Sequence, residues 1–256
     1  GVKKCLCFYE EKENILDGYI IFLYDCFYDD GFLPLRTHFL DNLKDTFELI
    51  EKKLETPKFE TDFHQHRLFG GGIQVWKDKV KFLLETIDIC EPNEYFVYSD
   101  VDVVFFKPII PILNEVLNNK DVVFIREIPH GSLPQQGGDV AGHCNFGFCV
   151  VKACDKSKRF FQDVLHMIEN TKNFVDSHDH ALWPDGLMDQ TCVNRILFSN
   201  PDYDLNWGTL PLTFTTTAYE TYNMINKDTV AYHATCVIEV NKKIELLNLF
   251  KQKVMG

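Results

Sequence analysis

Short apolar segments alternate along this chain with longer segments in which apolar residues recur three or four positions apart. The short segments predict buried β-strands, at Gly18–Asp25, Phe47–Ile50, Tyr98–Phe106, Val122–Ile125, Phe146–Lys152 and Val230–His233. The longer segments predict amphipathic helices, at Leu33–Leu43, Ile73–Ile87, Lys156–Asn170, Met188–Phe198 and Lys242–Lys253. A short helix is expected after Pro108, and short strands between Pro201 and Thr217. This alternation favours an α/β fold with a mostly parallel sheet covered by helices on both faces.

Two polar segments show neither a short apolar run nor the helical spacing of apolar residues. Within Thr56–His66, the spacing of His64 and His66 is compatible with a metal, but no cysteine or second histidine pair accompanies them, so we interpret the segment as a loop. The segment His130–His143 is rich in Gly, Gln and Pro. It is either a plain surface loop or a lid that orders over a bound ligand and excludes water.

Composition limits the class of protein. A chain of 256 residues with 45% hydrophobic content can bury one core, so we expect a single domain over residues 1–256. The net charge of -12 argues against a protein that binds nucleic acid across a broad surface. Nine cysteines without a CxxC pair favour a reducing compartment. No apolar run reaches the roughly 20 residues that span a bilayer, so we expect no membrane span in this chain and a cytoplasmic location. A Golgi-lumenal domain whose anchor has been removed is the alternative.

The segment Tyr98–Phe106 places two carboxylates, Asp100 and Asp102, two positions apart in an apolar strand. Because side chains alternate along a strand, both are predicted to face the same way. Two carboxylates this close repel each other, and a bound cation, a hydrogen-bond network or exposure to water would keep both ionised. The apolar neighbours disfavour exposure of the two carboxylates to water, and metal binding is the most specific of the three interpretations.

Four further motifs accompany the paired aspartates in a fixed order. They are Lys79–Ile87 before the strand, and Asn145–Phe148, Met188–Gln190 and Tyr232–Ala234 after it. The order resembles that of the nucleotide-diphospho-sugar transferases of the GT-A fold, over roughly Gly18–Phe250. The resemblance implies a Rossmann-like, mixed and mostly parallel sheet flanked by helices. It also implies a metal-dependent glycosyltransferase that moves a hexose or pentose from a UDP-sugar to a hydroxyl of a glycan acceptor.

The resemblance also implies roles for individual residues. Asp102, with His233 and also Asp100, would bind Mn2+ or Mg2+, and a mixed carboxylate and imidazole site suits Mn2+ better than Ca2+. A cation bridging the two phosphates stabilises the negative charge that develops on the leaving diphosphate. Asp189 and Gln190 would be catalytic, with Asp189 either the base that deprotonates the acceptor or the group that stabilises the cationic sugar.

Donor contacts are implied for residues in several segments: Tyr24, Asp25, Lys79, Asp100, Asn145, Gly147, Lys242 and Lys243. Asn145 and Gly147 would line the donor sugar, and Lys242 or Lys243 would neutralise the diphosphate. The sequence departs from the family here, because Ile238 and Glu239 replace the commoner glycine between the histidine and the lysine.

Structural interpretations compete with several of these roles. Tyr24 and Asp25 could simply begin a loop, Lys79 could belong to a solvated lysine face of its helix, and Asp189 could be only a helix N-cap. Aromatic and imidazole side chains could line an acceptor cleft by stacking on sugar faces, at Trp183, Trp207, His178 and His180. At least one of the two tryptophans is expected in the core.

Two other functions remain open at this point. In a phosphatase of the haloacid-dehalogenase type, Asp100 would be the nucleophile and Asp102 the acid/base. That motif normally follows the first strand of its domain, whereas about a hundred residues precede it here. A non-catalytic module that binds a sugar nucleotide is the third hypothesis.

Overall fold

The computed structural model describes residues 21–27, 32–54, 71–126, 144–171, 174–175, 182–183, 188–216, 225–234 and 239–256. Its main sheet has six strands in the order β2-β1-β3-β6-β5-β9. Their bounds are β1 Ile21–Phe27, β2 Glu48–Leu54, β3 Tyr95–Asp100, β5 Val122–Arg126, β6 Cys144–Lys152 and β9 Trp207–Thr209. Strand β6 is antiparallel to both neighbours and the other pairings are parallel. The predicted mixed, mostly parallel sheet is therefore confirmed.

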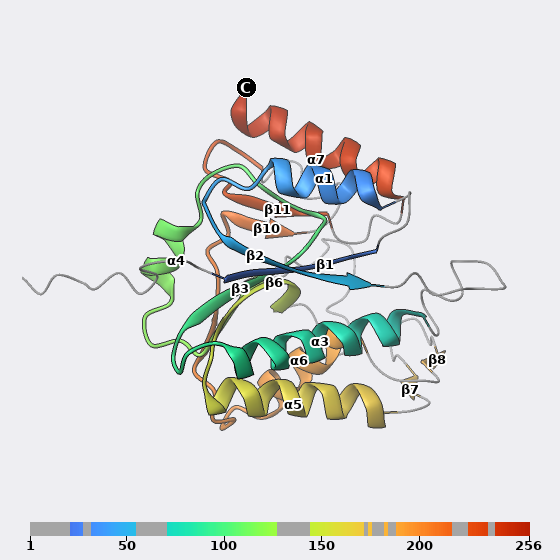
Figure 1. Cartoon of the computed structure of the whole chain (residues 1–256), viewed down its shortest axis with the longest axis vertical. Coiled ribbons are helices and arrows are strands. Elements are labelled where there is room, and N and C mark those ends of the chain that lie inside the picture. The colour runs from blue at the N-terminus through green and yellow to red at the C-terminus, as the bar shows by residue number, and fades with distance from the viewer. Residues whose placement is uncertain are drawn as a thin grey trace, which may run out of the picture.

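A second sheet of three strands, in the order β10-β11-β4, packs on the main sheet. Its strands are β10 Phe214–Thr216, β11 Ala231–His233 and β4 Val103–Phe105. Phe105 and Phe214 of this sheet lie with ring centroids 5.7 and 5.9 Å from that of Phe148 in β6. A short pair, β7 (Phe174–Val175) and β8 (Leu182–Trp183), stands apart from both sheets (Figure 1).

Helices cover the main sheet on both sides, as predicted (Figure 1). On one side lie α1 (Leu33–Asp41) and α7 (Val240–Met255), with β10 and β11 between α7 and the main sheet. On the other lie α3 (Gly71–Ile89), α5 (Asp155–Asn170) and α6 (Asp189–Ser199). The short helix α4 (Ile110–Val116), which has a proline in its first turn, lies at one end of the sheet.

Residue alternation along the central strands builds two separate cores. Phe22 and Val97 belong to the core beneath α1 and α7, whereas Leu23 and Phe96 belong to the core beneath α3, α5 and α6. All four side chains are fully buried. Strands that bury both faces consist of continuous apolar residues, and these short apolar runs made the strands recognisable in the sequence.

Strand β6 is irregular near its start. Phe124 of β5 pairs with Cys149 of β6, but the next residue, Ile125, pairs with Asn145. The intervening Phe146–Phe148 therefore form a bulge. Because β6 is antiparallel, this bulge lies beside the carboxyl end of β3, with Ser99 opposite Phe148. Ligands of open α/β sheets bind at this edge, and bulges commonly re-aim side chains there.

One prediction about the paired aspartates was wrong. The segment Tyr98–Phe106 is not a single strand, because β3 ends at Asp100, Val101 and Asp102 form a turn, and β4 continues in the second sheet. Alternation along one strand therefore does not set the directions of the two carboxylates. The turn between two sheets does.

Several predictions lie outside the described residues. They concern the loop Thr56–His66, the candidate lid His130–His143 and the pair His178 and His180. Within the described part, none of the helices is long and apolar enough to cross a membrane. Five cysteines whose side chains are described are free thiols: Cys90, Cys144, Cys149, Cys154 and Cys192. The cytoplasmic location remains a prediction.

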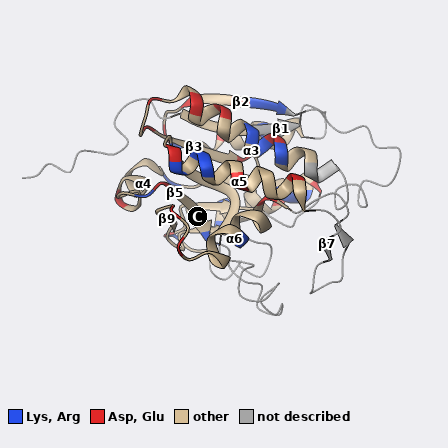
Figure 2. Ribbon diagram, turned by 90° about the horizontal axis from the view of Figure 1, so that it is seen from below, with Lys and Arg blue, Asp and Glu red and all other residues tan. Residues whose placement is uncertain are grey.

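Charged residues of both signs occur along α3 and α5 (Figure 2). The two helices are linked by an ion pair between Lys158 and Asp88. Mixed charge of this kind does not make a broad basic face on these helices, in agreement with the acidic net charge.

Candidate active site

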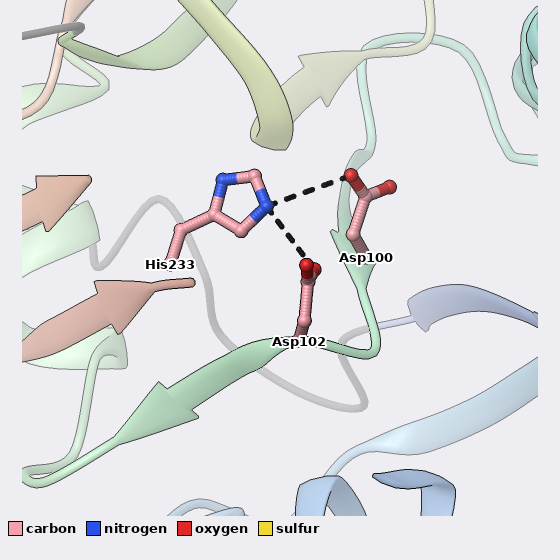
Figure 3. A group of neighbouring side chains, drawn as sticks. All are labelled: Asp100, Asp102 and His233. Atoms are coloured by element: carbon pink, nitrogen blue, oxygen red, sulfur yellow. Dashed lines mark ion pairs between the residues drawn. The ribbon is translucent and has the colours of Figure 1, made fainter. Parts of the chain in front are cut away.

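The turn between β3 and β4 brings Asp100 and Asp102 to His233 at the end of β11 (Figure 3). His233 Nε2 lies 3.1 Å from Asp102 Oδ1 and 3.8 Å from Asp100 Oδ2. The pairing of β4 with β11 causes this proximity, because Val103 is the register partner of His233. The Ala234 N–H also donates to the Asp102 carbonyl at 2.9 Å. One ligand atom from each of the three side chains lies within 4.8 Å of the others.

Asn145, in β6, orients the His233 ring. Its Oδ1 lies 2.8 Å from His233 Nδ1 and also accepts the Gly147 N–H at 2.9 Å. An amide oxygen only accepts, so Nδ1 carries a proton, and Nε2 faces the two carboxylates. This is the usual second partner of a metal-binding histidine. Burial lowers the pKa of His233, but the neighbouring Asp102 and Asp100 carboxylates outweigh it and raise the pKa above its ordinary value.

Lys243, from the first turn of α7, donates to Oδ2 of Asp102. Both residues are buried, each with 7% of its surface exposed. Burial raises the pKa of Asp102, yet the Lys243 ammonium and His233 more than compensate and hold it well below its usual range. Asp102 is therefore ionised, and its two oxygens face two different partners.

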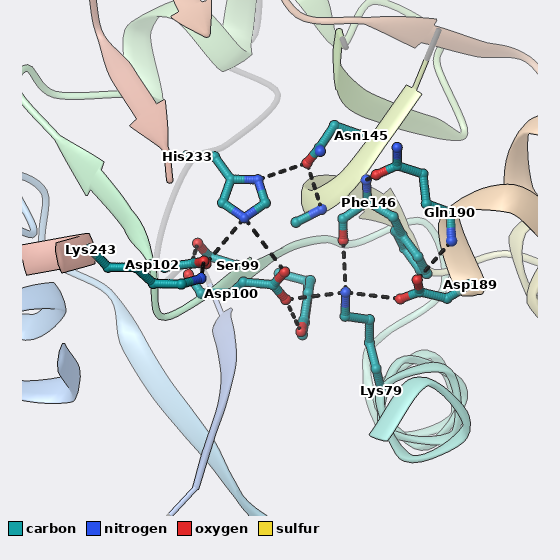
Figure 4. Close-up of polar contacts among 12 residues, drawn as sticks. Lys79, Ser99, Asp100, Asp102, Asn145, Phe146, Asp189, Gln190, His233 and Lys243 are labelled. Atoms are coloured by element: carbon teal, nitrogen blue, oxygen red, sulfur yellow. Dashed lines mark hydrogen bonds and ion pairs between the residues drawn. The ribbon is translucent and has the colours of Figure 1, made fainter. Parts of the chain in front are cut away.

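A second cluster centres on Lys79 of α3 (Figure 4). Its Nζ lies 3.1 Å from Asp100 Oδ1 and 3.0 Å from Asp189 Oδ2, and donates to the Phe146 carbonyl at 3.0 Å. Lys79 is only 6% exposed, so the solvated-face interpretation was wrong. The lysine joins the β3 turn, the β6 bulge and the start of α6 into one polar network.

Asp189 is the first residue of α6 and is buried. Its Oδ1 accepts the N–H of Gln190 at 2.7 Å. Burial raises the pKa of Asp189 above its ordinary value, although Lys79 opposes the shift. The side chain of Gln190 accepts the Phe146 N–H at 3.3 Å, so it ties α6 to the bulge. Met188 occupies the N-cap position of α6, so the N-cap interpretation of Asp189 was wrong, and Asp189 belongs to the polar network.

Tyr24 and Lys242, two other predicted donor residues, contact partners outside this network. The Tyr24 hydroxyl donates to Glu51 in β2, and Arg36 contacts the same pair. Asp25 is the register partner of Asp100 in the neighbouring strand, but its side chain is outside the described part of the chain. Lys242 is exposed and pairs with Glu239 at 2.6 Å.

Of the two tryptophans predicted to line an acceptor cleft, Trp207 lies away from the paired aspartates. Trp207 packs against Phe198 with ring centroids 5.2 Å apart. It pairs with Val122 at the start of β5, the end of the sheet opposite the paired aspartates. Trp207 is partly buried and packs against the core beneath α3, α5 and α6. Trp183 lies in β8.

Sequence reasoning missed two residues of this region. Asn194 of α6 is buried, and its amide accepts the Cys144 N–H and donates to the Cys144 carbonyl, both at 2.9 Å. An asparagine on the apolar face of a predicted helix was the available signal. Thr216 is the register partner of His233, and its buried hydroxyl has no hydrogen-bond partner among the described residues. Nothing local distinguishes Thr216 from its neighbours Thr215 and Thr217.

Comparisons with known proteins agree with this geometry. A family model described as nucleotide-diphospho-sugar transferase matches residues 49–247. A glycosyltransferase involved in the glycosylation of the major capsid of PBCV-1 is 15% identical with a TM-score of 0.55, covering 90% of this chain and 99% of that chain. The bifunctional glycosyltransferase WbbM is 10% identical with a TM-score of 0.51, covering 94% and 52%. The galactosyltransferase LgtC is 10% identical with a TM-score of 0.48, covering 90% and 96%.

At these identities the two matches with TM-scores above 0.5 establish the fold alone, which is the GT-A fold. A sequence comparison with curated proteins finds no match.

Proposed function

The chain belongs to the nucleotide-diphospho-sugar transferase family, and we propose that it moves a sugar from a UDP-sugar to a glycan hydroxyl with a divalent cation held by Asp100, Asp102 and His233. The observation that carries this proposal is the meeting of these three side chains at the edge of the sheet where ligands bind, with ligand atoms within 4.8 Å. Family membership favours this function over the phosphatase and the non-catalytic module.

The donor set fits Mn2+ or Mg2+. Two carboxylates and one imidazole are acceptable ligands for either ion, and the imidazole favours Mn2+. Asn145 supports this assignment because it holds Nε2 of His233 toward the carboxylates. When bound, the cation would stabilise the negative charge of the departing diphosphate.

The network around Lys79 supplies the remaining roles in the proposal. Lys79 links Asp100 to Asp189, and so fixes the distance between the cation site and the proposed catalytic carboxylate. The Lys79 ammonium offsets part of the negative charge of the Asp100 and Asp189 carboxylates. The raised pKa of Asp189 suits a group that accepts the acceptor's proton. Its alternative role is to stabilise the cationic sugar as its carboxylate.

Donor and acceptor contacts complete the proposal. Asn145 and Gly147, at the start of β6, would lie along the donor sugar. Lys243 would contact the diphosphate. Gln190, Tyr24, Asp25 and Lys242 remain candidates on the strength of the family resemblance alone.

A donor screen tests the proposal. The purified chain is incubated with a panel of UDP- and GDP-sugars, with Mn2+, with Mg2+ or with EDTA, and release of UDP or GDP is measured. We expect metal-dependent hydrolysis of at least one UDP-sugar. Metal-dependent release of phosphate from simple monoesters would instead indicate a phosphatase. Nucleotide binding without any turnover would indicate the non-catalytic module.

A further inference from the structure

The two oxygens of Asp102 face two different partners, His233 and Lys243. Oδ1 lies 3.1 Å from His233 Nε2, and Oδ2 accepts a hydrogen bond from the Lys243 ammonium. Asp102 and Lys243 are each 7% exposed, so water screens their attraction only weakly. Asp102 therefore serves two sites, a cation site formed with Asp100 and His233 and an ion pair with α7.

A divalent cation at Asp102 and a lysine on the same carboxylate repel each other. Like charges a few ångströms apart in a poorly screened site cost several times what they cost in water. The Lys243 side chain has a flexible four-carbon stem, so its ammonium can move to another anion without any movement of the helix. A diphosphate bound beside the cation offers such an anion.

We propose that Lys243 competes with the divalent cation for Asp102, and that a bound nucleoside diphosphate relieves this competition by drawing the ammonium onto its phosphates. The inference rests on the proposed function of the same site. Cation and diphosphate then bind with positive coupling, and each strengthens the other by the same factor. The site takes up its cation together with the donor and holds it weakly alone.

Titrations of Mn2+ followed by electron paramagnetic resonance, with and without UDP, test this coupling. Without UDP, Lys243→Met and Lys243→Gln should bind Mn2+ about tenfold more tightly than the wild type, because a positive charge has left the site. UDP should strengthen Mn2+ binding in the wild type several-fold more than in either variant. Lys243→Arg retains the charge and should behave like the wild type.

Lys251→Met is the matched control. It removes the same charge about two turns further along α7, at a residue whose ammonium donates to Asn42, and it should leave Mn2+ affinity without UDP unchanged. Lys243→Met leaves a buried carboxylate without its ammonium partner, which is destabilising. Lys243→Gln keeps a hydrogen-bond donor for Asp102 and covers the case in which the methionine variant does not fold. Circular dichroism establishes which variants are folded.

The inference is overturned if a folded neutral variant binds Mn2+ no more tightly than the wild type, or if UDP strengthens Mn2+ binding equally in both. If neither the wild type nor the folded neutral variant binds Mn2+, the inference is overturned as well. Mn2+ and UDP binding are measured without an acceptor. A protein that shows the coupling but transfers no sugar would therefore contradict the proposed function and leave this inference standing.

Discussion

The imidazole ring of His233 lies directly against the backbone of Gly147, and a Cβ at position 147 would fall 2.0 Å from Cε1 of the ring. No side chain fits in that space. The β6 bulge and the end of β11 can therefore meet only because residue 147 is glycine, and the position of the histidine depends on it.

Gly147→Ala should displace the His233 ring from Asp102. We expect loss of most metal-dependent activity, weaker Mn2+ binding and a destabilisation of about 1–3 kcal/mol, the usual cost of overpacking. Titration with Mn2+ and urea unfolding measure these effects. Gly208→Ala in β9 is the control, because its Cβ would lie 3.4 Å from Cε of the flexible Lys120 side chain. Equal behaviour of the two variants would contradict the role assigned to Gly147.

Asp102→Asn and Asp102→Ala should both abolish turnover, and both should lower stability because the buried Lys243 ammonium loses its ionised partner. Asparagine keeps the shape but loses the charge that a divalent cation requires. Circular dichroism checks the fold, and UDP release from the best donor checks activity. Full activity of either variant without added metal would refute the assignment of Asp102.

Asn145→Ala removes the oxygen that accepts the His233 Nδ1 proton at 2.8 Å. The ring is then no longer held with Nε2 toward the carboxylates, and loss of such a partner typically costs about 10–100-fold in metal affinity. Calorimetric titration with Mn2+ in the presence of UDP gives the comparison. Asn170→Ala, on the exposed end of α5, should bind Mn2+ as the wild type does.

Asp189→Asn should change how stability depends on pH. Below the ordinary Asp pKa of 3.8, Asp189 is protonated in the folded and unfolded chains alike, so its ionisation has no effect. As pH rises, the unfolded chain loses this proton first because the folded pKa is raised, and the wild type loses stability until its folded form has also ionised. Asparagine does not titrate.

Urea unfolding of both proteins from acid to neutral pH tests this sign. The stability of Asp189→Asn minus that of the wild type should increase with pH and then level off. A difference that is flat, or that falls with pH, would show that the pKa of Asp189 is not raised. The same variant should lose sugar transfer, since it can neither accept a proton nor stabilise a cation as a carboxylate.

Periodicity alone predicted most of the fold. Alternating strands and helices were recognisable because burial on both faces of a central strand, as at Phe22 and Leu23, requires continuous apolar sequence. The order of motifs identified the family and named Asp100, Asp102 and His233 together. Apolar runs are local properties, and the order of motifs is a property of the linear sequence, so both can be recognised without coordinates.

The contacts that make the site depend on packing between distant segments. The direction of the Asp102 carboxylate is set by a turn between two sheets, the orientation of the His233 ring by Asn145 from another strand, and the burial of Lys79 by the meeting of α3 with β6. Lys242 and Lys243 are adjacent and chemically identical, yet one is exposed beside Glu239 and the other is buried on Asp102. Sequence determined which chemical groups this protein has, and the packing of its sheets and helices decided which of them meet, because burial and distance govern charge interactions.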